Sequence, residues 1–456
     1  MEKRETFASR LGFILISAGC AIGLGDVWRF PYITGQYGGG LFVLVYLVFI
    51  IILGLPIMSM ELAVGRASRK SIATSFNVLE KKGHKWHWMG YLGMAGNYIL
   101  MMFYTTVASW MVAYFYKMLT GQFEGLDTQQ VGQVFNNLLA NPVEMTIWMV
   151  LTTVICFGIC SFGLQEGVEK VTKIFMVLLL AIIVVLAVRS MTLPNAVQGL
   201  KFYLLPDFSR MKEYGIWETI YAAMSQAFFT LSIGIGSLAI FGSYIGKERR
   251  LLGESIHIAA LDTAISIIAG LIIFPACFSF DVNPGEGPGL VFVTLPNIFY
   301  SMSGGRIWGS LFFIFMSFAA FSTVIAVFEN IISFAMDLWN WSRKKASFVN
   351  MFLLIVLSMP CVLGFNVLSG FQPLGAGSTV LDLEDFIISY NILPIGSLIY
   401  VLFCVSRYGW GFDNFMEEVN TGEGIKMPRA LRIYLTWILP AIILIVLIQG
   451  YINWFA

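Results

Sequence analysis

The feature that most limits the fold of this chain is a series of long apolar blocks separated by short polar segments. An α-helix needs about 20 apolar residues to cross ~30 Å of hydrocarbon, and each block has about that length. Because 58% of the 456 residues are hydrophobic and only 12% are charged, a soluble fold is excluded. The blocks predict an all-α integral membrane protein with eleven spans, at 11–37, 41–65, 88–119, 143–161, 166–189, 216–245, 251–280, 305–340, 347–364, 384–406 and 430–453.

Basic residues gather in alternate connecting segments. If the N-terminus is inside, the inside segments include the basic stretches 66–85, 247–250 and 343–345. The outside segments 121–144 and 364–385 contain no lysine or arginine. The positive-inside rule therefore predicts a cytoplasmic N-terminus and an outside C-terminus. We expect a multi-pass protein of the cell (plasma) membrane.

The side chains that usually carry chemistry show no catalytic pattern. The six cysteines lie in apolar blocks, and neither they nor the three histidines have the spacing of a metal site. No pair of nucleophile and base stands out, so we predict no enzymatic activity. The net charge of +1 gives no reason to expect nucleic acid as a partner. No obligatory protein partner is evident, and the lipid bilayer is the expected surrounding.

Two of the blocks contain closely spaced glycines at their centre. The first has IGLG at 22–25, and the sixth has IGIG at 233–236. Glycine costs a helix interior up to ~1 kcal/mol relative to alanine, so such pairs either break the helix or permit close helix packing. A break leaves peptide groups free, which is tolerable only where they line a cavity or bind a ligand. Breaks in the first and sixth spans are typical of an inverted repeat of five plus five helices, with the substrate and ion site between them.

Two acidic residues lie inside apolar blocks. Asp26 follows the first glycine pair, and Asp262 lies within the seventh block. An intramembrane acid costs at least ~2.5 kcal/mol on insertion scales, so it normally faces a partner, a cavity or an ion. Arg29, about one helical turn away, is one possible partner for Asp26. Asp262 has no basic residue at helical spacing in its own span, and a cation is its simplest partner.

Several long motifs, in this order, identify a family. GLGDVWRFPY at 23–32, YGGG at 37–40, LPIMSMELAVGR at 55–66, FFTLSIGIG at 228–236 and GPGLVFVTLP at 287–296 closely resemble the bacterial branch of the neurotransmitter:sodium symporter family. The resemblance covers nearly the whole chain.

The resemblance implies the fold of the leucine transporter, LeuT, in an eleven-helix variant. One transporter domain would then occupy residues 1–456. Its two inverted repeats are expected at 11–189 and 216–406, and the additional helix at 430–453.

The function implied is sodium-coupled symport of a neutral, hydrophobic or aromatic amino acid. Members that carry amines without a carboxylate have aspartate at the position of Gly23, so glycine implies an amino acid. Its carboxylate is expected at the first helix break, because half-helix N-termini present free N–H groups to anions. The substrate-binding residues implied are Cys20, Ala21, Gly23, Leu24, Gly25, Leu100, Tyr104, Phe229, Thr230, Ser232, Ile235, Thr323 and Val327.

Two sodium sites are implied by the same resemblance. The substrate carboxylate would complete one of them, which couples the two loads because each increases the affinity for the other. The ligands implied are Ala21, Asp26, Thr230 and Asp262 for that site, and Gly19, Ile22, Ala319, Ser322 and Thr323 for the other.

The sequence departs from LeuT at Asp26 and Asp262, which correspond to asparagines there. Chloride-dependent members hold an anion near the position of Ser266, one helical turn from Asp262. Because a fixed carboxylate can take over that role, we predict that chloride is not required. An alternative is that one of the two aspartates carries a proton in part of the cycle.

Two gates are also implied. The outer gate would pair Arg29 with Asp385. The inner gate would use Arg4, Phe7, Tyr244 and Asp337. Three other functions stay open at this point: a transporter of the same fold for an amine or osmolyte, a proton-coupled transporter, and an amino acid sensor that does not transport.

Overall fold

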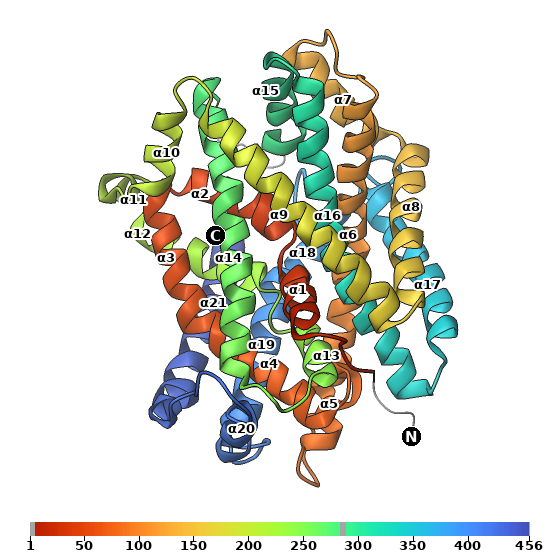
Figure 1. Cartoon of the computed structure of the whole chain (residues 1–456), viewed down its shortest axis with the longest axis vertical. Coiled ribbons are helices and arrows are strands. Elements are labelled where there is room, and N and C mark those ends of the chain that lie inside the picture. Colours follow the sequence, from red (N-terminus) through yellow and green to blue (C-terminus); the bar gives the residue numbers. More distant parts are fainter. Residues whose placement is uncertain (1–4, 283–288, 456) are drawn as a thin grey trace.

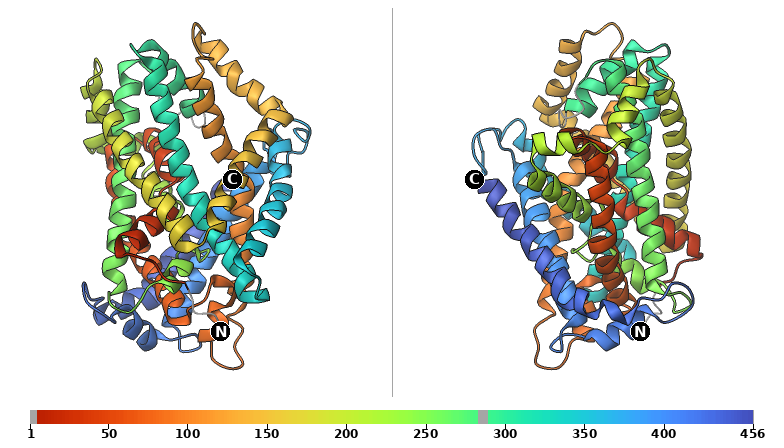
Figure 2. Two further views of the ribbon diagram at one scale, coloured as in Figure 1. Left: turned by 45° about the vertical axis from the view of Figure 1, so that its right-hand side comes forward. Right: turned by 90° about the vertical axis from the view of Figure 1, so that its left-hand side faces the viewer.

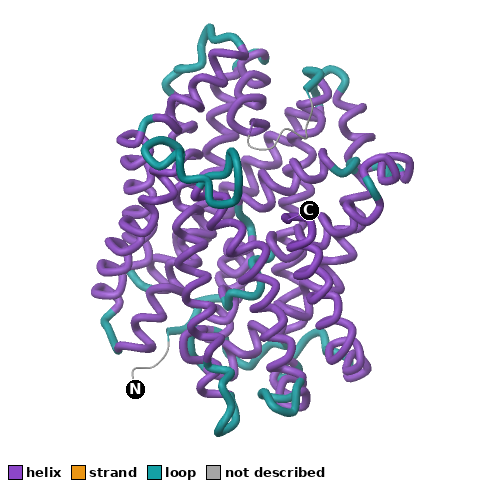
Figure 3. Tube along the Cα trace, turned by 180° about the vertical axis from the view of Figure 1, so that it is seen from behind, coloured by secondary structure: helices purple, strands orange, loops and turns teal. Residues whose placement is uncertain are grey.

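The chain folds into a bundle of helices (Figure 1). The computed structural model describes residues 5–282 and 289–455, and within them β-structure is limited to one isolated bridge between Arg249 and Glu423. The helices are joined mostly by short loops (Figure 3). In chain order they are α1 (Arg10–Ala21), η1 (Gly25–Arg29), α2 (Phe30–Gln36), α3 (Gly40–Phe49), η2 (Ile50–Gly54), α4 (Leu55–Ser68), α5 (Ile72–Leu79), α6 (Trp88–Leu119), α7 (Thr128–Ala140), α8 (Pro142–Ser161), η3 (Leu164–Glu169), α9 (Lys170–Met191), α10 (Ala196–Leu204), α11 (Phe208–Tyr214), α12 (Ile216–Thr230), α13 (Ser237–Tyr244), α14 (Leu251–Ser279), η4 (Leu290–Thr294), α15 (Leu295–Ser301), α16 (Gly305–Trp339), α17 (Arg343–Gly364), α18 (Val380–Asp385), η5 (Phe386–Ile392), α19 (Leu393–Val405), α20 (Phe412–Val419), η6 (Arg429–Leu431), η7 (Tyr434–Ile438) and α21 (Leu439–Phe455).

The apolar blocks of the sequence form membrane-length helices. Among the described residues, nine helices are long and apolar enough to span a bilayer, and the bent pair Arg10–Ala21 and Gly25–Gln36 makes a tenth candidate. The predicted sixth span consists of α12 and α13, which are each shorter than a single spanning helix. The all-helical membrane fold is confirmed, whereas the count of eleven spans stays a prediction.

Proline explains most of the irregular stretches within the long helices. Five of the six described π-helical segments (η1, η2, η4, η5 and η7) are followed directly by a residue and then a proline. Proline has no N–H, and its ring displaces the carbonyl group four residues earlier, so the local bonding shifts toward i→i+5. Four residues before Pro56, for example, the carbonyl oxygen of Ile52 accepts a hydrogen bond from the Tyr434 hydroxyl at 2.5 Å.

The centre of the bundle is formed by α16 and α6, which pack along each other. In their most apolar stretches, 83% of α16 and 72% of α6 are buried inside the protein, against 39% for α8 and 33% for the span η3–α9. The last two therefore present most of their apolar surface outward, as expected for helices that face lipid. Figure 2 shows α21 rising from the end of the bundle where α20 lies.

Candidate functional site

Both predicted helix breaks are present. The first span stops at Ala21, restarts at Gly25 and bends by 56°. In the sixth span, residues 231–236 between α12 and α13 form turns. Gly234 has a φ of 103°, and a Cβ atom there would lie 2.1 Å from the carbonyl oxygen of Leu393, so this position requires glycine.

A buried acid supports the second break. The Glu61 side chain accepts hydrogen bonds from the backbone N–H of Gly234 at 2.5 Å and of Leu238 at 3.3 Å. It therefore occupies the N-terminal end of α13, where a negative charge is favourable. Sequence reasoning quoted Glu61 within a motif but assigned it no role, although an acid in the second apolar block was a usable signal. Because a carboxylate of the protein itself occupies this helix end, the end is not available to another anion.

Two asparagines satisfy the carbonyl groups that the second break exposes. Asn97 donates to the carbonyl oxygen of Ile235 at 3.0 Å, and Asn330 donates to that of Gly236 at 3.4 Å. Asn330 also donates to the Asn97 side chain at 2.9 Å. Sequence reasoning missed both residues, because a single polar residue on an apolar helix does not reveal which backbone it faces.

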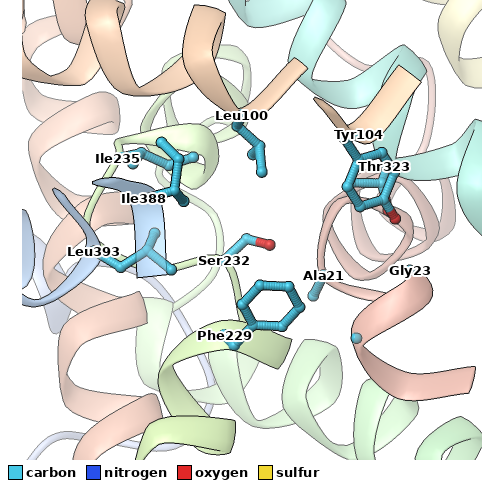
Figure 4. A pocket seen from close by; sticks show the side chains of 11 residues that line it. Ala21, Gly23, Leu100, Tyr104, Phe229, Ser232, Ile235, Thr323, Ile388 and Leu393 are labelled. Carbon is cyan, nitrogen blue, oxygen red and sulfur yellow. The ribbon is translucent and has the colours of Figure 1, made fainter. Parts of the chain in front are cut away.

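A cavity lies between the two breaks (Figure 4). It is lined by nine of the thirteen predicted substrate residues: Ala21, Gly23, Gly25, Leu100, Tyr104, Phe229, Ser232, Ile235 and Thr323. The predicted residues Cys20, Leu24, Thr230 and Val327 are buried nearby but do not line it. Two residues of the tenth span that sequence reasoning did not name, Ile388 and Leu393, complete the lining.

The two ends of this cavity differ in chemistry. At one end, the backbone N–H of Leu24 donates to the Tyr104 hydroxyl at 3.0 Å, close to Thr323. At the other end, Leu100, Ile235 and the residues of the tenth span present apolar side chains (Figure 4). A Cβ atom at position 23 would lie 2.3 Å from the Tyr104 hydroxyl oxygen, so a larger side chain at Gly23 would collide with the polar end.

The two intramembrane aspartates lie beside the first break. Asp26 is fully buried and accepts hydrogen bonds from the backbone N–H of Gly23 at 3.0 Å, the Ser266 hydroxyl at 2.5 Å and the Thr230 hydroxyl. Both carboxylate oxygens of Asp262 are buried, and among the described residues neither has a hydrogen-bond partner. Asp262 is close enough to Asp26 for the two carboxyl groups to interact electrostatically. A set of acidic and hydroxyl oxygens with unpartnered lone pairs fits a hard cation such as sodium.

A second group of oxygens lies where the first span faces α16. The Thr323 hydroxyl lies 3.0 Å from the carbonyl oxygen of Ile22 and 3.3 Å from that of Gly19. The Ser322 hydroxyl lies 3.3 Å from the Ile22 oxygen and 2.8 Å from that of Ala319. All five residues predicted for this sodium site therefore come together.

The predicted outer gate is not paired in this conformation. Arg29 lies over the ring of Phe229, 4.0 Å from its centre, and its Nη1 has no hydrogen-bond partner among the described residues. Asp385 accepts a hydrogen bond from Ser389 at 2.7 Å. Arg29 also does not pair with Asp26, so the ion pair considered as an alternative partner for Asp26 is absent in this conformation. The Arg29–Asp385 pair stays a prediction for another state of the cycle.

The residues predicted for the inner gate contact one another in part. The ring of Phe7 packs edge-on against Tyr244, with 5.8 Å between centres. Tyr244 donates to Glu329 at 2.6 Å, and Glu329 in turn pairs with Arg343 at 2.6 Å. Asp337 accepts hydrogen bonds from the backbone N–H of Ser71 and from Lys70. The fourth predicted residue, Arg4, lies outside the described residues.

The fold and the site define a secondary transporter with two broken helices around a central cavity. The family model "Sodium:neurotransmitter symporter family" matches residues 4–131 and 127–455. The chain belongs to this family of sodium-dependent transporters.

Several known proteins are similar over most of their length. The sodium-dependent transporter YhdH of Bacillus subtilis (strain 168) is 32% identical over 402 residues, which cover 88% of each chain. The sodium-dependent transporter MJ1319 of Methanocaldococcus jannaschii is also 32% identical, over 93% of this chain and 86% of its own. The crystal structure of MhsT in complex with L-phenylalanine shares 38% identity with a TM-score of 0.88, covering 98% of this chain and all of that one. Family membership confirms that the chain is a transporter rather than an enzyme.

Proposed function

We propose that this chain carries a neutral, hydrophobic or aromatic amino acid together with two sodium ions, by alternating access across the plasma membrane. The observation that carries the proposal is the polarity of the cavity: one end has the peptide N–H of Leu24 and the hydroxyl groups of Tyr104 and Thr323, while the other end is apolar. An amino acid has the matching polarity. An aspartate at position 23, which amine carriers have, would collide with the Tyr104 hydroxyl. The similarity to MhsT bound to L-phenylalanine also favours an amino acid.

The ions have a defined role in this proposal. One sodium ion binds among Ala21, Asp26, Thr230 and Asp262 and also contacts the substrate carboxylate. The other binds among Gly19, Ile22, Ala319, Ser322 and Thr323. Two sodium ions with a zwitterion bring a charge of +2, which two ionised aspartates balance, so no chloride ion is needed.

The transport cycle moves one group of helices against the other around this site. The repeats are residues 11–189 and 216–406, with 430–453 as the additional helix. Arg29 and Asp385 close the outer side, and Arg4, Phe7, Tyr244 and Asp337 close the inner side. The N-terminus is cytoplasmic and the C-terminus is outside, which agrees with the basic inside segments.

Transport assays with the reconstituted protein test this proposal. Liposomes that contain the protein should take up labelled leucine or phenylalanine when sodium is outside and choline inside, and uptake should vanish when choline replaces the external sodium. Replacement of chloride by gluconate should leave uptake unchanged. Sodium-dependent binding without counterflow would indicate a sensor, and uptake driven by a pH gradient alone would indicate proton coupling.

A further inference from the structure

The tenth span reaches the substrate cavity because it packs closely against the third and sixth spans, where glycines at the contacts have no side chain. A Cβ atom on Gly96 would lie 2.8 Å from the side chain of Ile392, and one on Gly396 would lie 1.9 Å from the carbonyl oxygen of Gly234. A Cβ atom on Gly234 would itself meet the backbone of Leu393. The start of α19 therefore lies directly on the unwound turns of the sixth span, with backbone against backbone.

The π-helical segment η5 then places two apolar side chains on the same face. The backbone N–H of Leu393 donates to the carbonyl oxygen of Ile388, an i→i+5 bond that stacks these two residues. In an α-helix, residues five apart would be separated by about 140° around the axis. Both side chains line the cavity, and both residues are almost fully buried, at 1% and 3% exposed. The proline at position 394, which disturbs the helical bonding, thus explains why both face the cavity.

We propose that Ile388 and Leu393 determine specificity by limiting the size of the substrate side chain. This inference rests on the proposed function, because it concerns the same cavity. Figure 4 places both residues at the end that Leu100 and Ile235 share, away from Gly23 and Tyr104. If the carboxylate of an amino acid binds at the polar end, the far end of its side chain meets this wall of the tenth span. The wall has no polar side chain, so it selects by volume and shape.

Substitutions at Ile388 test the inference, with the neighbouring Ile387 as a matched control. Ile387 is also an isoleucine in η5, but it is only partly buried and does not line the cavity. The readout is the affinity for alanine, leucine, phenylalanine and tryptophan, measured in sodium by scintillation proximity. Because one methylene in an apolar pocket discriminates by ~10-fold or more, Ile388→Ala should raise the affinity for tryptophan relative to leucine by at least ~10-fold. Ile388→Phe should lower phenylalanine and tryptophan binding by a similar factor and leave alanine little changed.

The outcomes separate this inference from the function on which it rests. If the unaltered protein binds no amino acid in sodium, the proposed function is wrong and this inference falls with it. If the unaltered protein binds but Ile388→Ala keeps the same ranking, or Ile387→Ala changes the ranking equally, the function stands and the inference is overturned. Ile388→Val, which removes one methylene and folds with less disturbance, should shift the ranking in the same direction by a smaller factor.

Discussion

Removing the Glu61 carboxylate should destabilise the substrate site, although Glu61 does not line the cavity. In Glu61→Ala, the backbone N–H groups of Gly234 and Leu238 lose their acceptor in a fully buried position. Each unsatisfied buried N–H costs ~1–3 kcal/mol, so the total is ~2–6 kcal/mol. Part of this cost is offset, because no cation pairs with Glu61 among the described residues and a buried charge is itself unfavourable. Glu61→Gln keeps one acceptor and should lose about half as much.

Thermal unfolding in detergent, with and without sodium and leucine, measures this effect. Glu61→Ala should unfold at a lower temperature and should lose the additional stabilisation that sodium and substrate provide. Met60→Ala is the control, because Met60 is an equally buried neighbour whose truncation costs packing but removes no hydrogen bond to the broken helix. It should lower the unfolding temperature but retain the ligand effect. The reasoning is refuted if Glu61→Ala responds to sodium and leucine as the unaltered protein does.

Three further substitutions address the ions and the inner gate. Asp262→Asn removes one unpartnered carboxylate and should weaken sodium-supported amino acid binding by ~5- to 150-fold without unfolding the protein; unchanged sodium affinity would remove Asp262 from the site. Thr323→Val keeps the shape but loses one hydroxyl ligand, so sodium should bind ~10-fold more weakly in a sodium titration, whereas equal affinity would argue against the second sodium site. Arg343→Ala leaves the buried Glu329 unpaired, at a cost of ~3–5 kcal/mol, and should increase hydrogen exchange at the start of α1 and the end of α13. The double variant with Glu329→Gln should recover most of that protection, and failure to recover would indicate that packing of the arginine side chain is responsible.

Most of the fold could be predicted from the sequence, because a bilayer imposes simple requirements. A helix must be about 20 apolar residues long to cross it, so block length alone located the long helices. The same requirement explains why breaks at 22–25 and 233–236 could be predicted, since exposed peptide groups inside a membrane need a ligand or a cavity. The π-helical segments were not predicted, although a proline follows most of them. A proline within an apolar block therefore favours a π-helical segment just before it.

The parts of the site that escaped prediction share a physical cause. Glu61, Asn97 and Asn330 act on the backbone of another span, and that role depends on which helices meet. Ile388 and Leu393 belong to the cavity only because glycines on two other spans bring the tenth span against the unwound turns. Arg29 and Asp385 were assigned to a gate that opens and closes, so one conformation need not contain their contact. Residues on a broken helix can thus be predicted from its own pattern, whereas residues that reach it from elsewhere require the three-dimensional packing. Nothing in the apolar sequence of the tenth span distinguishes Ile388 from Ile387. The wall that Ile388 and Leu393 form could therefore be found only from the packing of the helices.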